Sequence, residues 1–162
     1  MYRMLIVCCA IALALGCSKG EDKKKGEGEK PKKPAPAAGV DLGHLGLTGD
    51  APAGTKARKM GKSVMVQGTD LVVTVGIAGS FDAADIAAAT KEAKSNKATN
   101  IKSTKLADGF LVTYENKGSA GTNYWVEARR KIGGKDYACK TTASKPAQQA
   151  NAAKFCKSLK KK

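Results

Sequence analysis

The sequence is poor in the residues that most often carry out chemistry in proteins. It has a single histidine among 162 residues, which excludes sites built from several histidines and argues against a histidine-based catalytic triad. That residue, His44, lies between glycines in a predicted loop. The glycines at 43, 46 and 49 lack the spacing of a Walker or dinucleotide motif, and no EF-hand spacing occurs. We therefore expect neither enzymatic activity nor a cofactor.

Aromatic residues are also scarce, at 5% of the chain with one tryptophan. A core with few aromatic side chains is expected to be modest and to benefit from a disulfide. The tryptophan, Trp125, lies in a predicted strand, where such a residue either stacks on a ligand or packs against the core.

No apolar run reaches the roughly 20 residues that a membrane-crossing helix needs. The longest one, residues 4–16, follows Arg3 and contains no charge. A positive residue before a short apolar run is typical of a secretory signal. The run ends in Ala14-Leu15-Gly16-Cys17, which resembles the bacterial lipobox, although the family usually has leucine where Ala14 stands.

The lipobox resemblance implies cleavage before Cys17, a diacylglycerol on its thiol and an acyl chain on the new amino terminus. Several acyl chains on one residue anchor a protein stably. Ser18, by resemblance to the sorting pattern of enterobacterial lipoproteins, favours the outer over the inner membrane. We therefore expect a signal peptide over residues 1–16 and a lipid-anchored cell-envelope protein. The alternatives are an ordinary cleaved signal and a short uncleaved anchor.

Residues 17–38 have the composition of a tether. They hold seven lysines, four acidic residues and three prolines, with no large apolar residue. Such a segment buries too little apolar surface to offset its ordering entropy, so we expect a disordered linker. Contact of its lysines with anionic head groups is the alternative.

The cysteines pair once the signal peptide is taken away. Cys8 and Cys9 leave with the signal and Cys17 is lipidated, so Cys139 and Cys156 remain. In an exported protein these two are expected to form a disulfide. Their separation is not that of a C-x-x-C redox motif, and no partner ligands for a metal lie nearby.

Residues 39–162 are expected to form one domain in which strands are joined as hairpins. Residues 71–77 alternate apolar and small residues with period two, as a strand does. Gly133-Gly134 separates two further alternating runs and indicates a hairpin turn. The predicted strands are residues 63–67, 71–77, 101–106, 109–114, 124–132 and 135–142.

Two stretches have helical periodicity. The first has Asp82 as its expected cap, with Asp85 supporting the first turn. The second begins at Pro146, carries Cys156 on its apolar stripe, and has lysines 160–162 at its expected end.

The predicted fold is therefore α+β, with an antiparallel sheet, two helices, and a disulfide that fixes the C-terminal helix to the sheet. This order, with LTGDAPAGTKARKM leading into paired strands, resembles the Mog1/PsbP-like fold of some exported lipoproteins. That resemblance implies no enzymatic activity.

Positive charge is the remaining feature of the sequence that indicates a binding partner. Residues 39–162 hold 21 Lys+Arg against 10 Asp+Glu, a net charge of +11. A field of this sign favours anionic partners such as lipid head groups or lipopolysaccharide, while the absence of a recognised motif argues against nucleic acid. The candidate anionic-ligand surface is one hairpin with Arg129, Arg130, Lys131 and Lys135.

Two functions stay open: a non-enzymatic envelope module that binds a partner or has a structural role, and a module that binds an acidic ligand. A lysine-rich solvated surface is the plainer interpretation of the charge.

Overall fold

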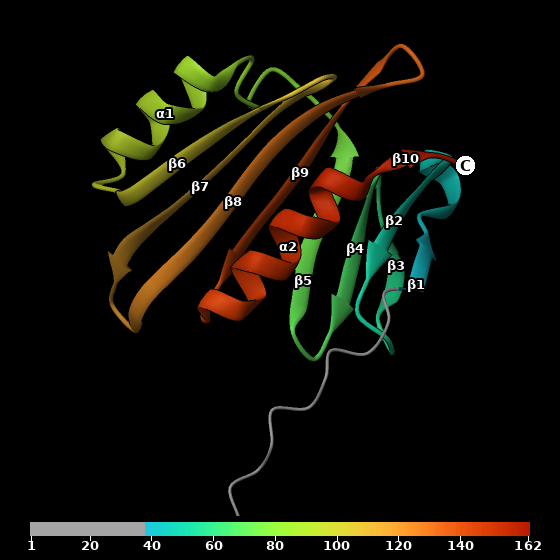
Figure 1. Ribbon diagram of the computed structural model, residues 1–162, viewed down its shortest axis with the longest axis horizontal. Helices are drawn as coiled ribbons and strands as arrows, with labels where there is room; N and C mark the ends of the chain where they lie inside the picture. The colour runs from blue at the N-terminus through green and yellow to red at the C-terminus, as the bar shows by residue number, and fades with distance from the viewer. Residues whose placement is uncertain (1–37) are drawn as a thin grey trace, which may run out of the picture. The chain divides into compact units, whose positions relative to one another are not determined.

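The structure is a computed structural model and describes residues 38–162. A seven-stranded antiparallel sheet in the order β3-β4-β5-β9-β8-β7-β6 forms its framework (Figure 1). A smaller sheet in the order β1-β2-β10 packs against helix α2 through β2. The elements are β1 Ala38–Asp41, the 3-10 helix η1 Gly43–Leu45, β2 Leu47–Ala51, β3 Lys56–Met60, β4 Ser63–Gly68, β5 Leu71–Ile77, α1 Ile86–Ser95, β6 Thr99–Leu106, β7 Gly109–Gly118, β8 Gly121–Ile132, β9 Lys135–Ala143, α2 Pro146–Ser158 and β10 Lys160–Lys161.

The α+β fold and its antiparallel sheet are confirmed. All six predicted strands are present, and each is as long as predicted or longer. Gly133 and Gly134 have positive φ angles of 58° and 80°, as a tight hairpin turn between β8 and β9 requires.

The two helices cover opposite faces of the large sheet. Side chains of β7 alternate between the faces: Leu111 joins the α2 core, whereas Phe110 and Val112 pack with α1. Helix α2 contacts β5, β7, β8 and β9 on one face, and α1 packs mainly against β6 and β7 on the other. The α1 face of β4, β5 and β9 is therefore left without a helix (Figure 1).

The termini of both helices differ in part from the prediction. Asp85, not Asp82, caps α1, because its Oδ1 accepts a hydrogen bond from the backbone N–H of Ala88 at 2.8 Å. Pro146 begins α2 as predicted. The terminal lysines do not extend α2, since Lys160 and Lys161 form strand β10 beside Thr48 and Leu47.

The small sheet packs closely against α2 at Gly49 of β2. A Cβ atom at Gly49 would lie 2.7 Å from Cε2 of Phe155, a contact that forces the ring to move. We expect Gly49→Ala to lower the free energy of unfolding by about 2 kcal/mol, as overpacking does. Gly39→Ala in the neighbouring strand is the control, because nothing lies within 4 Å of its added Cβ. Equal urea midpoints for the two variants would contradict this packing.

Candidate functional site

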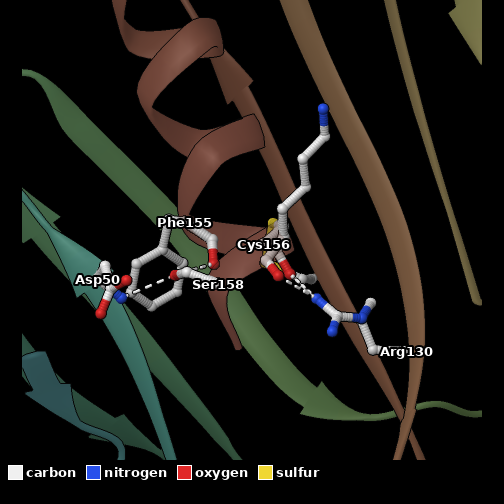
Figure 2. The surroundings of a disulfide bond; sticks show 7 residues. Asp50, Arg130, Phe155, Cys156 and Ser158 are labelled. Carbon is white, nitrogen blue, oxygen red and sulfur yellow. Dashed lines mark hydrogen bonds between the residues drawn. A yellow bond between two sulfur atoms is a disulfide. The ribbon is translucent and has the colours of Figure 1, made fainter. Parts of the chain in front are cut away.

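The predicted disulfide joins the sheet to the last helix. Cys139 of β9 and Cys156 of α2 are bonded, and both side chains are fully buried in the core between sheet and helix. Ser158 ties the same helix end to β2, because its Oγ accepts a hydrogen bond from the backbone N–H of Asp50 at 2.7 Å (Figure 2). The end of α2 is thus held on two sides.

Arg130, predicted as part of an anionic-ligand surface, is an internal residue. Its guanidinium donates to both carboxylate oxygens of Asp108, at 2.7 and 2.8 Å. It also donates to the carbonyl oxygens of Cys156 and Lys157, at 2.7 and 2.6 Å (Figure 2), and to that of Leu159 at 3.3 Å. These carbonyls lie at the C-terminus of α2, where the helix leaves them without partners. Arg130 therefore caps a helix and has little capacity for a ligand.

The other three cationic residues of the hairpin differ from one another in the sheet face they occupy and in their ion pairing. Arg129 lies on the opposite face from Arg130 and forms an ion pair with Asp136 at 3.0 Å. Lys131 and Lys135 are exposed. The structure therefore does not bring the four predicted residues together on one surface.

Lys135 instead belongs to a basic cluster at one end of the large sheet. The β3–β4 turn, the end of β5 and the start of β9 meet there, because Met60 pairs with Ser63 and Ile77 pairs with Tyr137. A hollow of about 410 Å³ at this end contains no acidic residue in its lining. It is lined by His44, Leu45, Lys59, Gly61, Lys62, Ile77, Lys135 and Tyr137, and we call it the basic end.

The basic end also exposes apolar surface. Ile77, which lines this hollow, is 53% exposed. Positive side chains around exposed aliphatic groups match a lipid surface, which presents phosphates above acyl chains. Sequence analysis missed Lys59 and Lys62 because they are far from the β8–β9 hairpin in the chain.

A second group of charged side chains lies on the uncovered face of the sheet. Glu127 is 5% exposed, and its Oε1 accepts a hydrogen bond from the Tyr114 hydroxyl at 3.0 Å. Burial raises the pKa of Glu127 above its usual range, although the Tyr114 hydrogen bond opposes this. Burial beside the Glu127 carboxylate likewise raises the pKa of Tyr114.

Asp82 completes this charged group. It forms an ion pair with Lys140 at 2.7 Å and accepts a hydrogen bond from the Gly79 N–H. Burial alone would raise the pKa of Asp82, but these two hydrogen bonds outweigh it and leave the pKa lowered. Asp82, predicted as a helix cap, thus holds a lysine of the sheet in place.

The raised pKa of Glu127 makes stability depend on pH. Below its unfolded pKa of about 4.3, a carboxyl group whose pKa is higher in the folded state does not lower the free energy of unfolding. Its ionisation destabilises the fold increasingly as the pH rises from there through the folded pKa. We therefore expect Glu127→Gln, which keeps an acceptor for Tyr114, to be more stable than the wild type near neutral pH. Urea unfolding across pH measures this, and an advantage that grew toward acidic pH would contradict it.

No family model matches the chain, and no curated protein matches it significantly. Cys17 and residues 18–37 of the tether lie outside the described residues, so the lipobox stays a prediction. The Mog1/PsbP-like resemblance of the folded domain, which no family match supports, also stays a prediction. Within residues 38–162, no helix is both long and apolar enough to traverse a bilayer. No three His, Cys, Asp or Glu side chains gather there in a way that would hold a metal ion.

Proposed function

We propose that this chain is a lipid-anchored cell-envelope protein whose folded domain is a non-enzymatic module that binds anionic lipid head groups. The anchor is Cys17, acylated after removal of residues 1–16, and the outer membrane is its proposed location. The observation that carries the binding proposal is the basic end, where three lysines surround a hollow without an acidic lining residue.

The anchor proposal has support from the cysteines. Disulfides persist mainly in exported proteins, and the Cys139–Cys156 bond uses the only two cysteines left after the signal and anchor are assigned. A domain that folds with this bond is suited to the envelope, where a lipid anchor places it.

The binding proposal has support from charge and position. Ala38, where the tether enters, pairs with Ala51, whereas Asp41 at the opposite end of β1 pairs with Thr48, which in turn lies beside Lys160. His44 and Leu45 of the basic end follow Asp41 in the chain. The tether therefore enters at the end of β1 away from the basic end. A tether of some 20 residues is long enough to let the domain turn toward a lipid surface.

Vesicle cosedimentation tests the binding proposal. The protein would begin at residue 17 with Cys17→Ser, so that no lipid contributes, and the vesicles would be phosphatidylcholine with or without phosphatidylglycerol. We expect binding only to the anionic vesicles and a steep loss with added salt. Lys59→Gln/Lys62→Gln/Lys135→Gln should weaken binding about a hundredfold, since each lysine near an anionic surface contributes roughly 1 kcal/mol and each 1.4 kcal/mol is a factor of ten.

The matched control removes the same charge elsewhere. Lys91, Lys94 and Lys102 are exposed on α1 and β6, and their change to glutamine should weaken binding less than about threefold, because screening limits distant charges. Equal losses in both triple variants would show that net charge acts without a defined surface. Absence of binding at low salt would refute the proposal.

A further inference from the structure

The face of the large sheet that α1 leaves uncovered contains a second hollow, of about 370 Å³. Its floor crosses three strands, because Thr74 pairs with Lys140 and Lys140 pairs with Glu127. Next to this row, Gly76 pairs with Ala138, and both residues line the hollow. Trp125 of β8 also lines the hollow and pairs with Thr142 of β9. We call it the sheet hollow.

Glu127 is the unusual residue of the sheet hollow. Its Oε1 is bonded to Tyr114, but its Oε2 is buried and has no hydrogen-bond partner among the described residues. A buried carboxylate oxygen without a partner costs free energy. The space on its other side, beside Ala83 and Phe110, measures only about 10 Å³. Of these two spaces at Glu127, the sheet hollow is the one large enough for a ligand to approach the carboxyl group.

A hydroxyl group is the partner that suits Glu127 best. An ionised carboxylate accepts a hydrogen bond, a protonated one also donates, and a hydroxyl can serve in both cases. Further hydroxyl groups line the same space, from Ser63, Thr74 and Thr142. Such side chains match a ligand that carries several hydroxyl groups.

The charges of the sheet hollow favour a neutral ligand. Lys140 and Asp82 already neutralise each other at 2.7 Å. An anion would meet the Glu127 carboxyl group, while the net charge of +11 on residues 39–162 repels a cation. An uncharged ligand is repelled neither by the Glu127 carboxyl group nor by the net positive charge of the domain.

Trp125 provides a flat apolar surface in a fixed orientation. Its ring stacks on Tyr114 with centroids 5.7 Å apart, and its Nε1 donates to Oδ1 of Asn116 at 2.9 Å. Both contacts hold the indole before a ligand arrives, which lowers the entropy cost of binding. We propose that the sheet hollow binds a neutral polyhydroxylated ligand of the size of a mono- or disaccharide, with one ligand hydroxyl on Glu127 and the ligand ring against Trp125.

The proposal can be tested directly because Trp125 is the only tryptophan of the chain. The lipidated protein, in a detergent without a sugar head group, would be titrated with N-acetylglucosamine and with maltose while tryptophan emission is recorded. We expect a saturable change with at least one of them. Glu127→Gln should weaken binding at least tenfold, and Thr74→Val should weaken it a few-fold and serves if the first variant fails to fold.

The control is Glu115→Gln on the neighbouring strand β7, which lies outside the sheet hollow and should bind as the wild type does. No saturable change with either sugar would overturn the proposal. Unchanged affinity in both Glu127→Gln and Thr74→Val would do the same. Saturation by methylammonium but by neither sugar would replace it with a cation site. None of these results bears on vesicle binding, because the lysines changed in that test, Lys59, Lys62 and Lys135, do not line the sheet hollow.

Discussion

Arg130→Ala is expected to lower the free energy of unfolding by about 4 kcal/mol. The change leaves Asp108 without its bidentate partner and the last carbonyls of α2 without donors. Removing one partner of a buried ion pair costs about 3–5 kcal/mol. The partial exposure of Asp108, at 32% of its side chain, reduces that figure, and the lost carbonyl hydrogen bonds restore it.

Urea unfolding at neutral pH measures this loss, with Lys131→Ala as the matched control. Lys131 is adjacent in sequence but exposed, so its change should stay within about 0.5 kcal/mol of the wild type. Arg130→Lys should recover only part of the stability, because an ammonium group cannot form the two parallel bonds to Asp108. Equal effects for Arg130→Ala and Lys131→Ala would show that the helix cap contributes nothing.

The same ion pair predicts sensitivity to acid. The hydrogen bond from Arg130 lowers the pKa of Asp108 below its usual range. Such a group stabilises the fold above its unfolded pKa, and this contribution is lost as the pH falls toward the folded pKa.

Removal of the disulfide is expected to cost about 3 kcal/mol. The bond closes a loop between residues 17 apart in sequence, and the chain-entropy model gives roughly that value for a loop of this length. Cys139→Ala/Cys156→Ala is the suitable variant, because both positions are fully buried and serine would bury a hydroxyl group.

Urea unfolding with and without reductant provides the control. Reductant should destabilise the wild type by about the same 3 kcal/mol and should leave the double variant unchanged. A double variant within about 0.5 kcal/mol of the oxidised wild type would mean that the core alone holds α2 on the sheet.

Local patterns in the sequence predicted much of the fold. Period-two alternation located β5, and Gly133-Gly134 located the β8–β9 hairpin. The pairing of β5 with β9 was not predictable in this way, because 60 residues separate Ile77 from its partner Tyr137. Lys160 and Lys161 were assigned to a helix end for the same reason: their partners lie in β2.

The candidate site was harder to predict than the fold. Arg129, Arg130 and Lys131 were grouped because they are consecutive, yet consecutive strand residues point to opposite faces. Arg130 is in phase with Ala128 and Val126, which are buried, and that signal was present in the sequence. The joining of Lys59 and Lys62 with Lys135 follows from sheet order, which no local pattern contains.

The proposed location in the envelope depends on the lipid anchor at Cys17, which would also hold the domain near lipid head groups. The most direct test is the intact mass of the protein from its native membrane fraction, with and without reductant. We expect a chain that begins at Cys17, carries two to three acyl chains, and gains about two protons on reduction of Cys139–Cys156. A mass without lipid, or one that retains residues 1–16, would contradict this expectation.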